Sequence, residues 1–197
     1  MHDDKQTIAQ TAARLVVEEG TEYSQAKRRA VKLLRLPART PLPDNVQVEQ
    51  AVLETIALFC ADTQPAELRA LRSLAADWMQ RLQPFRPYLC GAVWRGTATR
   101  MSDIYLQLFC DDSKSAEIAL IDMGVRFDVG CITGFQGGQV DVLSLQVACP
   151  ALQAHVGIHL LIYDFDDLRG ALKPDAQGKS LRGDLAALQN LLHDERI

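Results

Sequence analysis

The spacing of apolar residues changes at the segment Pro84-Phe85-Arg86-Pro87, and this change constrains the fold more than any other feature of the sequence. Before it, apolar residues recur every three to four positions, which is the spacing of one helix face. After it, β-branched and apolar residues alternate with polar ones between glycines, which is typical of strands. The sequence therefore predicts an α+β protein with a helical region at 1–83 and a region with a mixed or antiparallel sheet at 84–197.

Four helices are expected before the change of spacing. The apolar stripe that includes Ile8, Ala12 and Leu15 ends at Gly20, a residue type that commonly stops helices. Prolines then disfavour helical backbone between the second and third helices, and Asp44 is placed to cap the start of the third. The expected helices after the first are 23–36, 46–60 and 66–82.

Six strands and a closing helix are expected after the change of spacing. Each expected strand is a run of alternating apolar and polar residues between glycines or short polar turns. The expected strands are 88–94, 103–110, 115–122, 125–130, 139–147 and 155–163. The apolar residues of 181–193 return to helical spacing, so a C-terminal helix is expected there.

Composition argues against several classes of protein. Lys and Arg number 21 against 25 Asp and Glu, and the net charge of -4 argues against a protein that coats nucleic acid through bulk charge. The apolar stretch 156–163 is too short to cross a bilayer, and the first residues are polar, unlike a secretion signal. The 5 cysteines are odd in number and evenly spread, which is typical of reduced thiols. The sequence therefore predicts a cytoplasmic protein that does not bind membranes.

The segment from Gly91 to Leu108 carries the strongest indication of chemistry. A strand leads into Gly91, a turn rich in glycine and threonine follows, and a second strand begins near Asp103. Because side chains alternate along a strand, Asp103 and Tyr105 share one face, and Ile104 lies on the other with its apolar partners. One face is expected to be core, and the other a site or a solvent-exposed surface.

Two further carboxylates are candidates for the same site. If 103–110 and 115–122 form an antiparallel hairpin, Asp103 is opposite Asp122 at its open end. Asp141 lies between apolar neighbours on a later strand, where a carboxylate needs a partner such as a metal ion or a cation. Solvation at a strand end or a sheet edge is the alternative interpretation for Asp122 and Asp141.

Other polar groups of the sheet region are interpreted without a site. His155 and His159 face the same way on one strand, but the strand rise places them roughly 13 Å apart, too far for one metal ion. Ser144 lacks the Gly-x-Ser-x-Gly context of hydrolases. The glycine-rich segment 134–138 is expected to be a hairpin loop with Phe135 at its tip.

The pattern around Gly91 and Asp103 resembles the signature of the polymerase-β-type nucleotidyltransferase superfamily. In that signature Gly and a second Gly or Ser are followed by a short spacer and by Asp-hydrophobic-Asp/Glu-hydrophobic, with a third carboxylate on a later strand. Here Gly91 takes the first position, and Gly96-Thr97 matches a Gly-Thr pair that often follows. Asp103-Ile104 matches the first Asp-hydrophobic pair, and Asp141 resembles the third carboxylate. Bacterial proteins of the nucleotidyltransferase type are also similar to the whole chain, including segments 23–30, 42–45 and 167–169.

The resemblance implies a nucleotidyltransferase-like core that binds a nucleoside triphosphate with Mg²⁺. In that family the glycine turn approaches the nucleotide phosphates, and the carboxylates hold two Mg²⁺ ions for attack on the α-phosphate. The candidate phosphate-binding residues, which include two arginines suited to phosphate oxygens, are Gly91, Ala92, Arg95, Gly96, Thr97 and Arg100. The implied catalytic residues are Asp103 and Asp141, and the candidate metal ligands are Asp103, Asp122 and Asp141.

Two positions depart from the family pattern. Ala92 stands where Ser or Gly is usual, and Tyr105 stands where the second metal-binding carboxylate belongs. A phenol with a pKa of about 10 is a poor substitute for that carboxylate, although Asp122 replaces it if the hairpin register holds. An active enzyme of this type would transfer a nucleotidyl group to a protein or RNA acceptor. The alternative is a catalytically inactive nucleotide-binding or protein-interaction module of the same fold.

Overall fold

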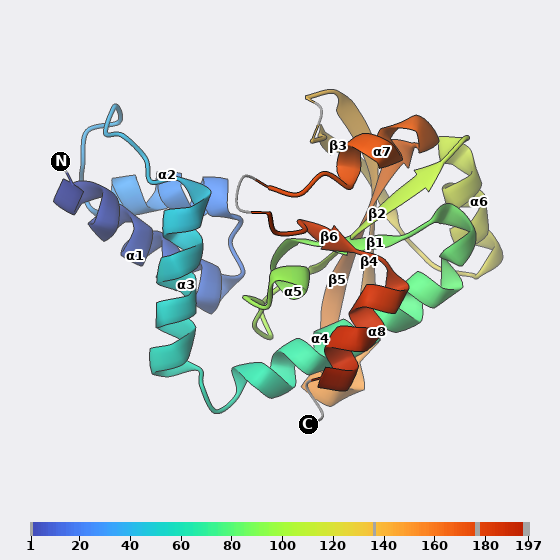
Figure 1. The fold of residues 1–197 in the computed structure, drawn as a ribbon, viewed down its shortest axis with the longest axis horizontal. Helices are drawn as coiled ribbons and strands as arrows, with labels where there is room; N and C mark the ends of the chain where they lie inside the picture. The colour runs from blue at the N-terminus through green and yellow to red at the C-terminus, as the bar shows by residue number, and fades with distance from the viewer. Residues whose placement is uncertain (1, 136, 176–177, 195–197) are drawn as a thin grey trace. The chain divides into compact units, whose positions relative to one another are not determined.

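The computed structural model describes residues 2–135, 137–175 and 178–194, and the chain forms two compact units (Figure 1). The helical unit comprises residues 1–68 and 97–102, and the sheet unit comprises residues 69–96 and 103–197. The predicted α+β class, with a helical front, a mixed sheet and a C-terminal helix, is confirmed. The boundary between the compact units lies inside α4 (Gln64–Arg81). The division into domains at 1–83 and 84–197 stays a prediction.

The helical unit is built around α1 (His2–Glu19), α2 (Tyr23–Leu33) and α3 (Asn45–Phe59). At the start of α3 the Asp44 carboxylate accepts the N–H of Gln47 at 2.8 Å, and the Gln47 side chain accepts the N–H of Asp44 at 3.0 Å. The apolar faces of the three helices meet in one core that includes Ile8, Ala30 and Val52. This shared burial, rather than helix propensity, stabilises helices of such length.

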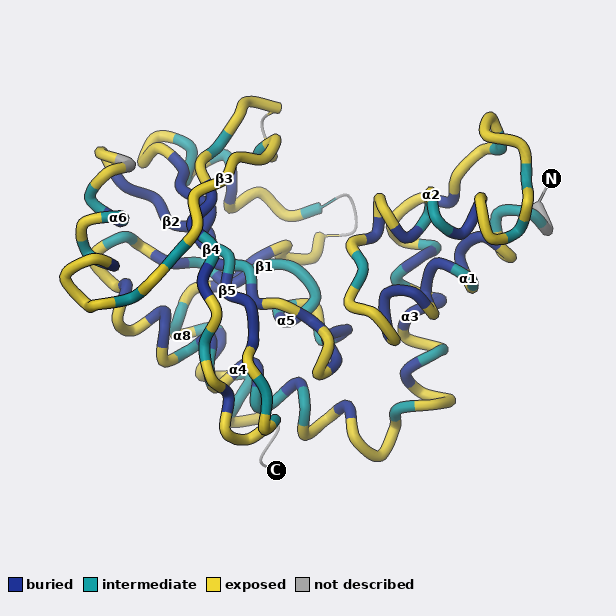
Figure 2. The backbone as a smooth tube through the Cα atoms, turned by 180° about the vertical axis from the view of Figure 1, so that it is seen from behind, coloured by how far each residue is buried: buried dark blue, intermediate teal, exposed yellow. Residues whose placement is uncertain are grey.

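The sheet unit has six described strands in the order β3-β4-β5-β2-β1-β6 (Figure 1). Their bounds are β1 (Tyr88–Cys90), β2 (Ile104–Cys110), β3 (Asp128–Thr133), β4 (Gln139–Cys149), β5 (Ala154–Asp164) and β6 (Arg182–Gly183). β2 and β5 run parallel, and the other neighbouring strands run antiparallel. The central strands are buried, whereas β3 at one edge is exposed along its length (Figure 2).

The remaining helical segments of the sheet unit connect and cover these strands. They are η1 (Gln83–Phe85), α5 (Gly91–Arg95), α6 (Ser113–Asp122), η2 (Pro150–Leu152), η3 (Phe165–Asp167), α7 (Leu168–Ala171) and α8 (Leu185–Asp194). Across the described part of the chain, every helix is too short or too polar to cross a membrane. The cytoplasmic location stays a prediction.

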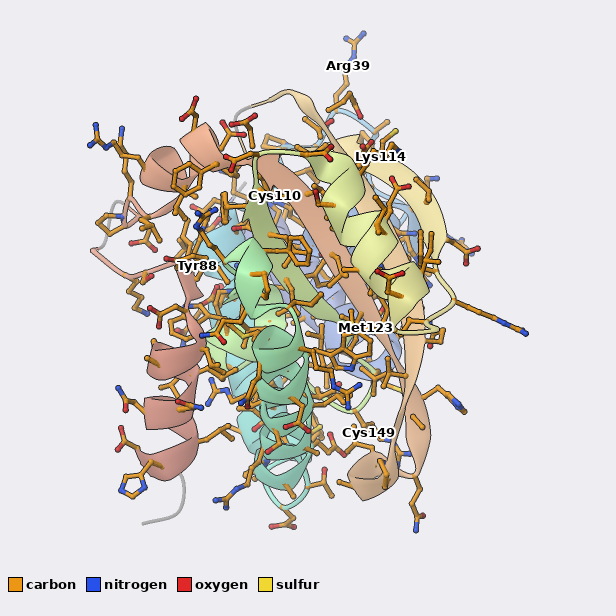
Figure 3. All side chains as sticks on the ribbon, turned by 90° about the vertical axis from the view of Figure 1, so that its right-hand side faces the viewer. Arg39, Tyr88, Cys110, Lys114, Met123 and Cys149 are labelled. Atoms are coloured by element: carbon orange, nitrogen blue, oxygen red, sulfur yellow. The ribbon has the colours of Figure 1, made fainter. Side chains whose placement is uncertain are left out.

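The sheet has two unlike faces. The covered face carries Ile104, Leu106 and Leu108, each 0% exposed, and α6, α8 and the second half of α4 lie on one side of the sheet (Figure 3). Lys114, labelled in Figure 3, lies on α6 on this side of the sheet. The hydrogen bond to Glu117 raises the pKa of Lys114, and the nearby charge of Asp141 on β4 raises it further, so α6 lies close to Asp141. The open face is the opposite one.

The open face carries Asp103, Tyr105, His159 and Ser144. At one end of it, α7 packs against a small apolar cluster that includes Phe109, Val142, Leu161 and Tyr163. Toward the other end the side chains are polar and partly exposed. Among the described helices of the sheet unit, therefore, α6, α8 and the second half of α4 cover one face of the sheet, and the polar region lies on the other face.

Residues 115–122 form part of the helix α6 rather than the predicted strand. Ala116, Ile118 and Leu120 alternate with other residues, which imitates a strand over a short run. In the structure Ala116 and Leu120, four residues apart, are buried, whereas Ile118 is 55% exposed. The Asp112 carboxylate accepts a backbone N–H of the first turn and starts the helix. The predicted hairpin between this segment and the preceding strand is therefore wrong.

Replacing Gly20 with alanine is expected to destabilise the helical unit by about 2–4 kcal/mol. Gly20 follows α1 with a φ of 66°, and a Cβ at this position would overlap the backbone oxygen of Met101. The left-handed backbone is itself unfavourable for a residue with a Cβ, and the overlap adds to that cost. Urea unfolding followed by circular dichroism measures the change.

Gly124 is the matched control, because its φ is 67° and no described atom lies within 4 Å of the place where its Cβ would be. Gly124→Ala is expected to cost about 1–2 kcal/mol, the backbone effect alone. Equal losses for the two variants would contradict the close approach of Met101 to Gly20.

Candidate functional site

The parallel pairing of β2 and β5 places Asp103 beside Gly157. Ile104 pairs with Ile158, so Asp103 lies one position before the paired segment, next to Gly157. Asp103 Oδ1 accepts the backbone N–H of Gly157 at 3.1 Å, and Asp103 Oδ2 lies 3.1 Å from His159 Nε2. A Cβ on Gly157 would lie 2.5 Å from Asp103 Oδ1. Glycine at 157 is therefore what allows the carboxylate to reach the backbone of β5.

His159 links Asp103 to Ser144. The Oγ of Ser144 and the Nδ1 of His159 are 2.9 Å apart, and the ring of Tyr105 stacks on that of His159 with centroids 4.8 Å apart. An ionised carboxylate only accepts hydrogen bonds, so His159 donates from Nε2 to Asp103. In the neutral ring Nδ1 then accepts the Ser144 hydroxyl proton. This hydrogen-bonded chain, the Ser144–His159–Asp103 chain, fixes both the tautomer and the orientation of the imidazole.

The pKa of Asp103 lies below its ordinary value of 3.8. The hydrogen bond from His159 is the main cause; burial opposes it, and the N–H of Gly157 reinforces it. The Asp103 side chain is 45% exposed and that of His159 22% exposed, so water reaches both. Asp103 is therefore ionised at neutral pH, with both of its oxygens already hydrogen-bonded to β5.

A cavity of about 510 Å³ opens next to this chain of hydrogen bonds. Asp128 pairs with Ser144, so both project from the open face. Gln146 is two positions from Ser144 on β4, and His155 is four positions from His159 on β5, so these side chains project from the same face. The residues that line the cavity include Arg126, Phe127, Asp128, Ser144, Gln146 and His155. The volume is in the range of small-molecule sites, and the lining offers a guanidinium, a ring and several hydrogen-bonding groups.

Part of the predicted phosphate-binding turn is a short helix. β1 ends at Cys90, and residues 91–95 form α5. Gly91 has a φ of 73° and lies against Tyr105, whose ring carbon would be 3.6 Å from a Cβ on Gly91. Arg72 of α4 donates to the carbonyl oxygens of Val93 and Trp94 at 3.1 Å each and thereby caps the C-terminal end of α5. Gly91 is thus held beside Tyr105.

The other candidate phosphate-binding residues are divided between the two units. Ala92 and Arg95 lie within α5, and Gly96 ends it with a φ of 84°. Thr97 and Arg100 belong to the helical unit, where Thr97 is 1% exposed and the backbone N–H of Arg100 donates to Glu67 at 2.9 Å. Of the candidate phosphate-binding residues, Gly91 lies beside Tyr105 on the open face, and the phosphate-binding role of all six stays a prediction.

The structure does not bring the three candidate metal ligands together. β4 pairs with β5 without interruption from Asp141 to Ser144, so Asp141 projects from the covered face, whereas Asp103 is on the open face. The implied catalytic pair, Asp103 and Asp141, is separated in the same way. Asp122 is the last residue of α6 and is exposed, because a helix replaces the strand that would have put it opposite Asp103. The described residues contain no group of three or more acidic, His or Cys side chains that could hold a metal ion.

Three residues of this site, Ser144, Gly157 and His159, were not predicted as site residues. Alternation places His159 on the same face as His155, as the sequence indicates, but the partners of His159 come from two other strands. The available signal was a histidine two positions after a glycine within an otherwise apolar strand. The sequence does not show that β5 pairs with β2, and without that pairing His159 cannot be assigned Asp103 as its partner.

Comparisons with known proteins find partial structural similarity. No protein-family model and no curated protein matches the chain. The chain is similar to the Cid1 poly(U) polymerase with MgGTP bound, at 16% identity and a TM-score of 0.34 over 51% of this chain and 32% of that chain. It is also similar to a cytoplasmic RNA terminal U-transferase, at 15% identity and a TM-score of 0.36 over 55% of this chain and 36% of that chain. The chain spans about a third of the length of these proteins, and we base no functional conclusion on likeness of this extent.

Asp103→Asn is expected to lower the free energy of unfolding of the sheet unit at pH 7 by about 0.5–1 kcal/mol, since the pair with His159 is partly screened by water. The folded-state pKa of Asp103 is lowered, so its contribution is present above the ordinary value of 3.8 and is lost as the pH falls through the folded value. The difference between wild type and variant is therefore expected to shrink below that pH. Urea unfolding at pH 7 and pH 3 measures it.

Asp122→Asn removes an exposed carboxylate and serves as the control; because Asp122 ends α6, where a negative charge is unfavourable, no loss of stability is expected at either pH. A difference between wild type and Asp103→Asn that stays constant with pH would contradict the stabilising role of the ionised Asp103.

Proposed function

We propose that this protein binds a nucleoside triphosphate on the open face of its sheet and acts as a binding module without transferring the nucleotidyl group. The observation that carries the proposal is the cavity of about 510 Å³ beside the Ser144–His159–Asp103 chain. A nucleotide needs surfaces for a base and for phosphates. The ring of Phe127 suits a base, and the guanidinium of Arg126 suits phosphate oxygens.

The proximity of Gly91, Tyr105 and Asp103 supports the same ligand. These residues belong to the segment that resembles the nucleotidyltransferase signature. Gly91 lies against Tyr105, which stacks on the ring of His159, and His159 bonds to Asp103. The two ends of the resembling segment therefore meet at the polar region of the open face, which supports a nucleotide as the ligand of the cavity.

Two Mg²⁺ ions, which the resemblance implies, do not fit these residues. Both oxygens of Asp103 already accept hydrogen bonds from β5, and Tyr105 offers a phenol in place of a carboxylate. Asp141 projects from the other face of the sheet. Catalysis by two metal ions needs oxygen ligands that converge on both ions, so we propose binding in place of transfer. The predicted protein or RNA acceptor has no role in this proposal.

The Ser144–His159–Asp103 chain does not favour hydrolysis as a second function. A serine, a histidine and an aspartate joined by hydrogen bonds are the residue types that activate a serine nucleophile in hydrolases. β4, however, is paired with β3 on one side and with β5 on the other at Ser144. Its backbone N–H groups are therefore engaged in the sheet, and the oxyanion that forms on a substrate attacked by Ser144 would lack donors from the backbone of β4.

Titration calorimetry with the four nucleoside triphosphates, with and without Mg²⁺, tests the proposal. At least one nucleotide is expected to bind, with a dissociation constant that changes less than about threefold when Mg²⁺ is omitted. Arg126→Met is expected to weaken that binding by about tenfold or more, because a charge-assisted hydrogen bond to phosphate is lost.

Arg169→Met is the matched control, since Arg169 lies in α7 outside the cavity and the change in charge is the same. It is expected to leave nucleotide binding unchanged. The absence of binding for all four nucleotides would refute the proposed ligand. Mg²⁺-dependent release of pyrophosphate would refute the proposed lack of transfer.

The double variant Tyr105→Asp, His159→Asp is expected to create a divalent-cation site on the open face. Positions 103 and 105 project from one face, and position 159 pairs with position 105, so three carboxylates would then converge. Mn²⁺ binding followed by electron paramagnetic resonance is expected to give a dissociation constant of about 10⁻⁴–10⁻³ M, as for weak oxygen-ligand sites.

The isosteric variant Tyr105→Asn, His159→Asn is the control and is expected to bind Mn²⁺ no better than the wild type. If the two double variants bind Mn²⁺ equally, positions 103, 105 and 159 do not converge as the strand register requires.

A further inference from the structure

Arg182 is a buried guanidinium with two nitrogens that lack an acceptor. The residue is 8% exposed, and its Nε and Nη1 have no hydrogen-bond partner among the described residues. Burial lowers the pKa of Arg182 from its ordinary value, but a guanidinium stays charged at neutral pH. Buried guanidinium nitrogens without acceptors are unfavourable, so these two donors call for a group with acceptor atoms, and an anion is the one that also balances the charge.

The strand register places Arg182 on the open face. Arg182 of β6 pairs with Cys90 of β1, and Cys90 pairs with Tyr105 of β2. Directly opposed residues point to the same side of a sheet, so the side chain of Arg182 leaves the same face as that of Tyr105. Its guanidinium lies 5.1 Å from the centroid of the Phe135 ring, which in turn lies 4.8 Å from the ring of Tyr163.

This location is separate from the nucleotide cavity. The cavity residue Ser144 pairs with His159, which is four positions from Tyr163 on β5. At the rise of a strand, roughly 13 Å separates Tyr163 from that pair, and the cavity residue His155 lies farther along β5. A ligand of Arg182 would therefore occupy the end of the open face where α7 packs, and its existence does not depend on the proposed nucleotide.

The nearest carboxylate along the chain is already engaged elsewhere. Asp184 follows β6, and its Oδ1 accepts the backbone N–H of Ala187 at 2.8 Å, which starts α8. Gln107 is a second buried group on the open face whose needs are unmet, since it is 5% exposed and its Oε1 has no partner among the described residues. The unpartnered nitrogens of Arg182 are donors, and buried donors without partners are the feature of a polar site that is completed by a ligand with acceptor atoms.

We propose that Arg182 is the anchor of a binding site for a small phosphoryl anion. A phosphoryl group carries negative charge and several acceptor oxygens, so it can serve more than one nitrogen of a guanidinium. The phenol of Tyr163 adds a donor, because burial raises its pKa and keeps it protonated at neutral pH. The small exposed area of Arg182 favours inorganic phosphate or pyrophosphate over the phosphoryl group of a larger molecule.

Thermal unfolding of the full chain, with and without ligand, tests the site. Inorganic phosphate and pyrophosphate at millimolar concentration are expected to raise the Tm of the wild type. Arg182→Met is expected to have a Tm about 2–4 °C higher without ligand, since a buried charge with two nitrogens lacking acceptors is removed, and to show no shift with either anion. Arg28→Met, at an exposed position of α2 and with the same change in charge, is expected to keep the wild-type shift.

A second measurement on the wild type does not require the variant to fold. Cys90 lies opposite Arg182, so bound pyrophosphate is expected to slow its alkylation by iodoacetamide at least threefold. Cys131 on the exposed edge strand β3 is the internal reference and is expected to react at an unchanged rate.

Three results would overturn the proposal: an anion shift that Arg182→Met retains, a wild type that none of the anions stabilises, or Cys90 and Cys131 alkylation rates that pyrophosphate does not separate. Adenosine monophosphate distinguishes the source of the phosphoryl group. A stronger shift with it than with inorganic phosphate would assign the site to a phosphate monoester, and an equal or weaker one to the free anion.

Discussion

The parallel pairing of β2 with β5 is the constraint on which the open face depends. It brings Asp103 to Gly157 and His159 across separations of 54 and 56 residues. Parallel strands cannot be joined by a tight turn, so α6, β3 and β4 all lie between them in the chain. The same excursion brings β4 to the far side of β5 and places Ser144 against His159. One strand pairing thus assembles groups from three strands into a single hydrogen-bonded chain.

Strand alternation then decides which residues can act together. Ser144 and Asp141 are three positions apart on one strand, and this odd separation sends them to opposite faces. Asp141 consequently lies on the side that α6 covers, where the charge of Lys114 is near it. Asp103 instead faces a histidine and a glycine N–H, which satisfy an ionised carboxylate without a cation. The open face is therefore suited to hold organic groups by hydrogen bonds and poorly suited to hold two metal ions.

Local patterns in the sequence predicted much of the fold, and their limits have physical causes. Helix spacing, Gly20 and the cap at Asp44 predicted the helical front, because these signals act within a few residues. The strand assigned to 115–122 was wrong, since a short run with buried residues four apart also satisfies alternation. That error created the false pairing of Asp103 with Asp122. The role of His159 needed a strand pairing across more than fifty residues, which no local pattern carries.

Among the described residues of the sheet unit, the buried polar side chains that break ordinary packing rules by keeping atoms without a hydrogen-bond partner lie on one face of the sheet. The covered face obeys those rules, with aliphatic side chains such as Leu106 and Leu160 fully buried. The open face breaks them at Arg182 and Gln107, whose buried polar atoms lack partners among the described residues. Natural sequences keep such costs where function requires them, because a buried charge is replaced at little cost by an apolar residue when only stability matters. A face that retains two guanidinium nitrogens without acceptors beside ordinary core residues is not explained by the packing of the described residues alone, and this is the reason that we propose an anion to complete it.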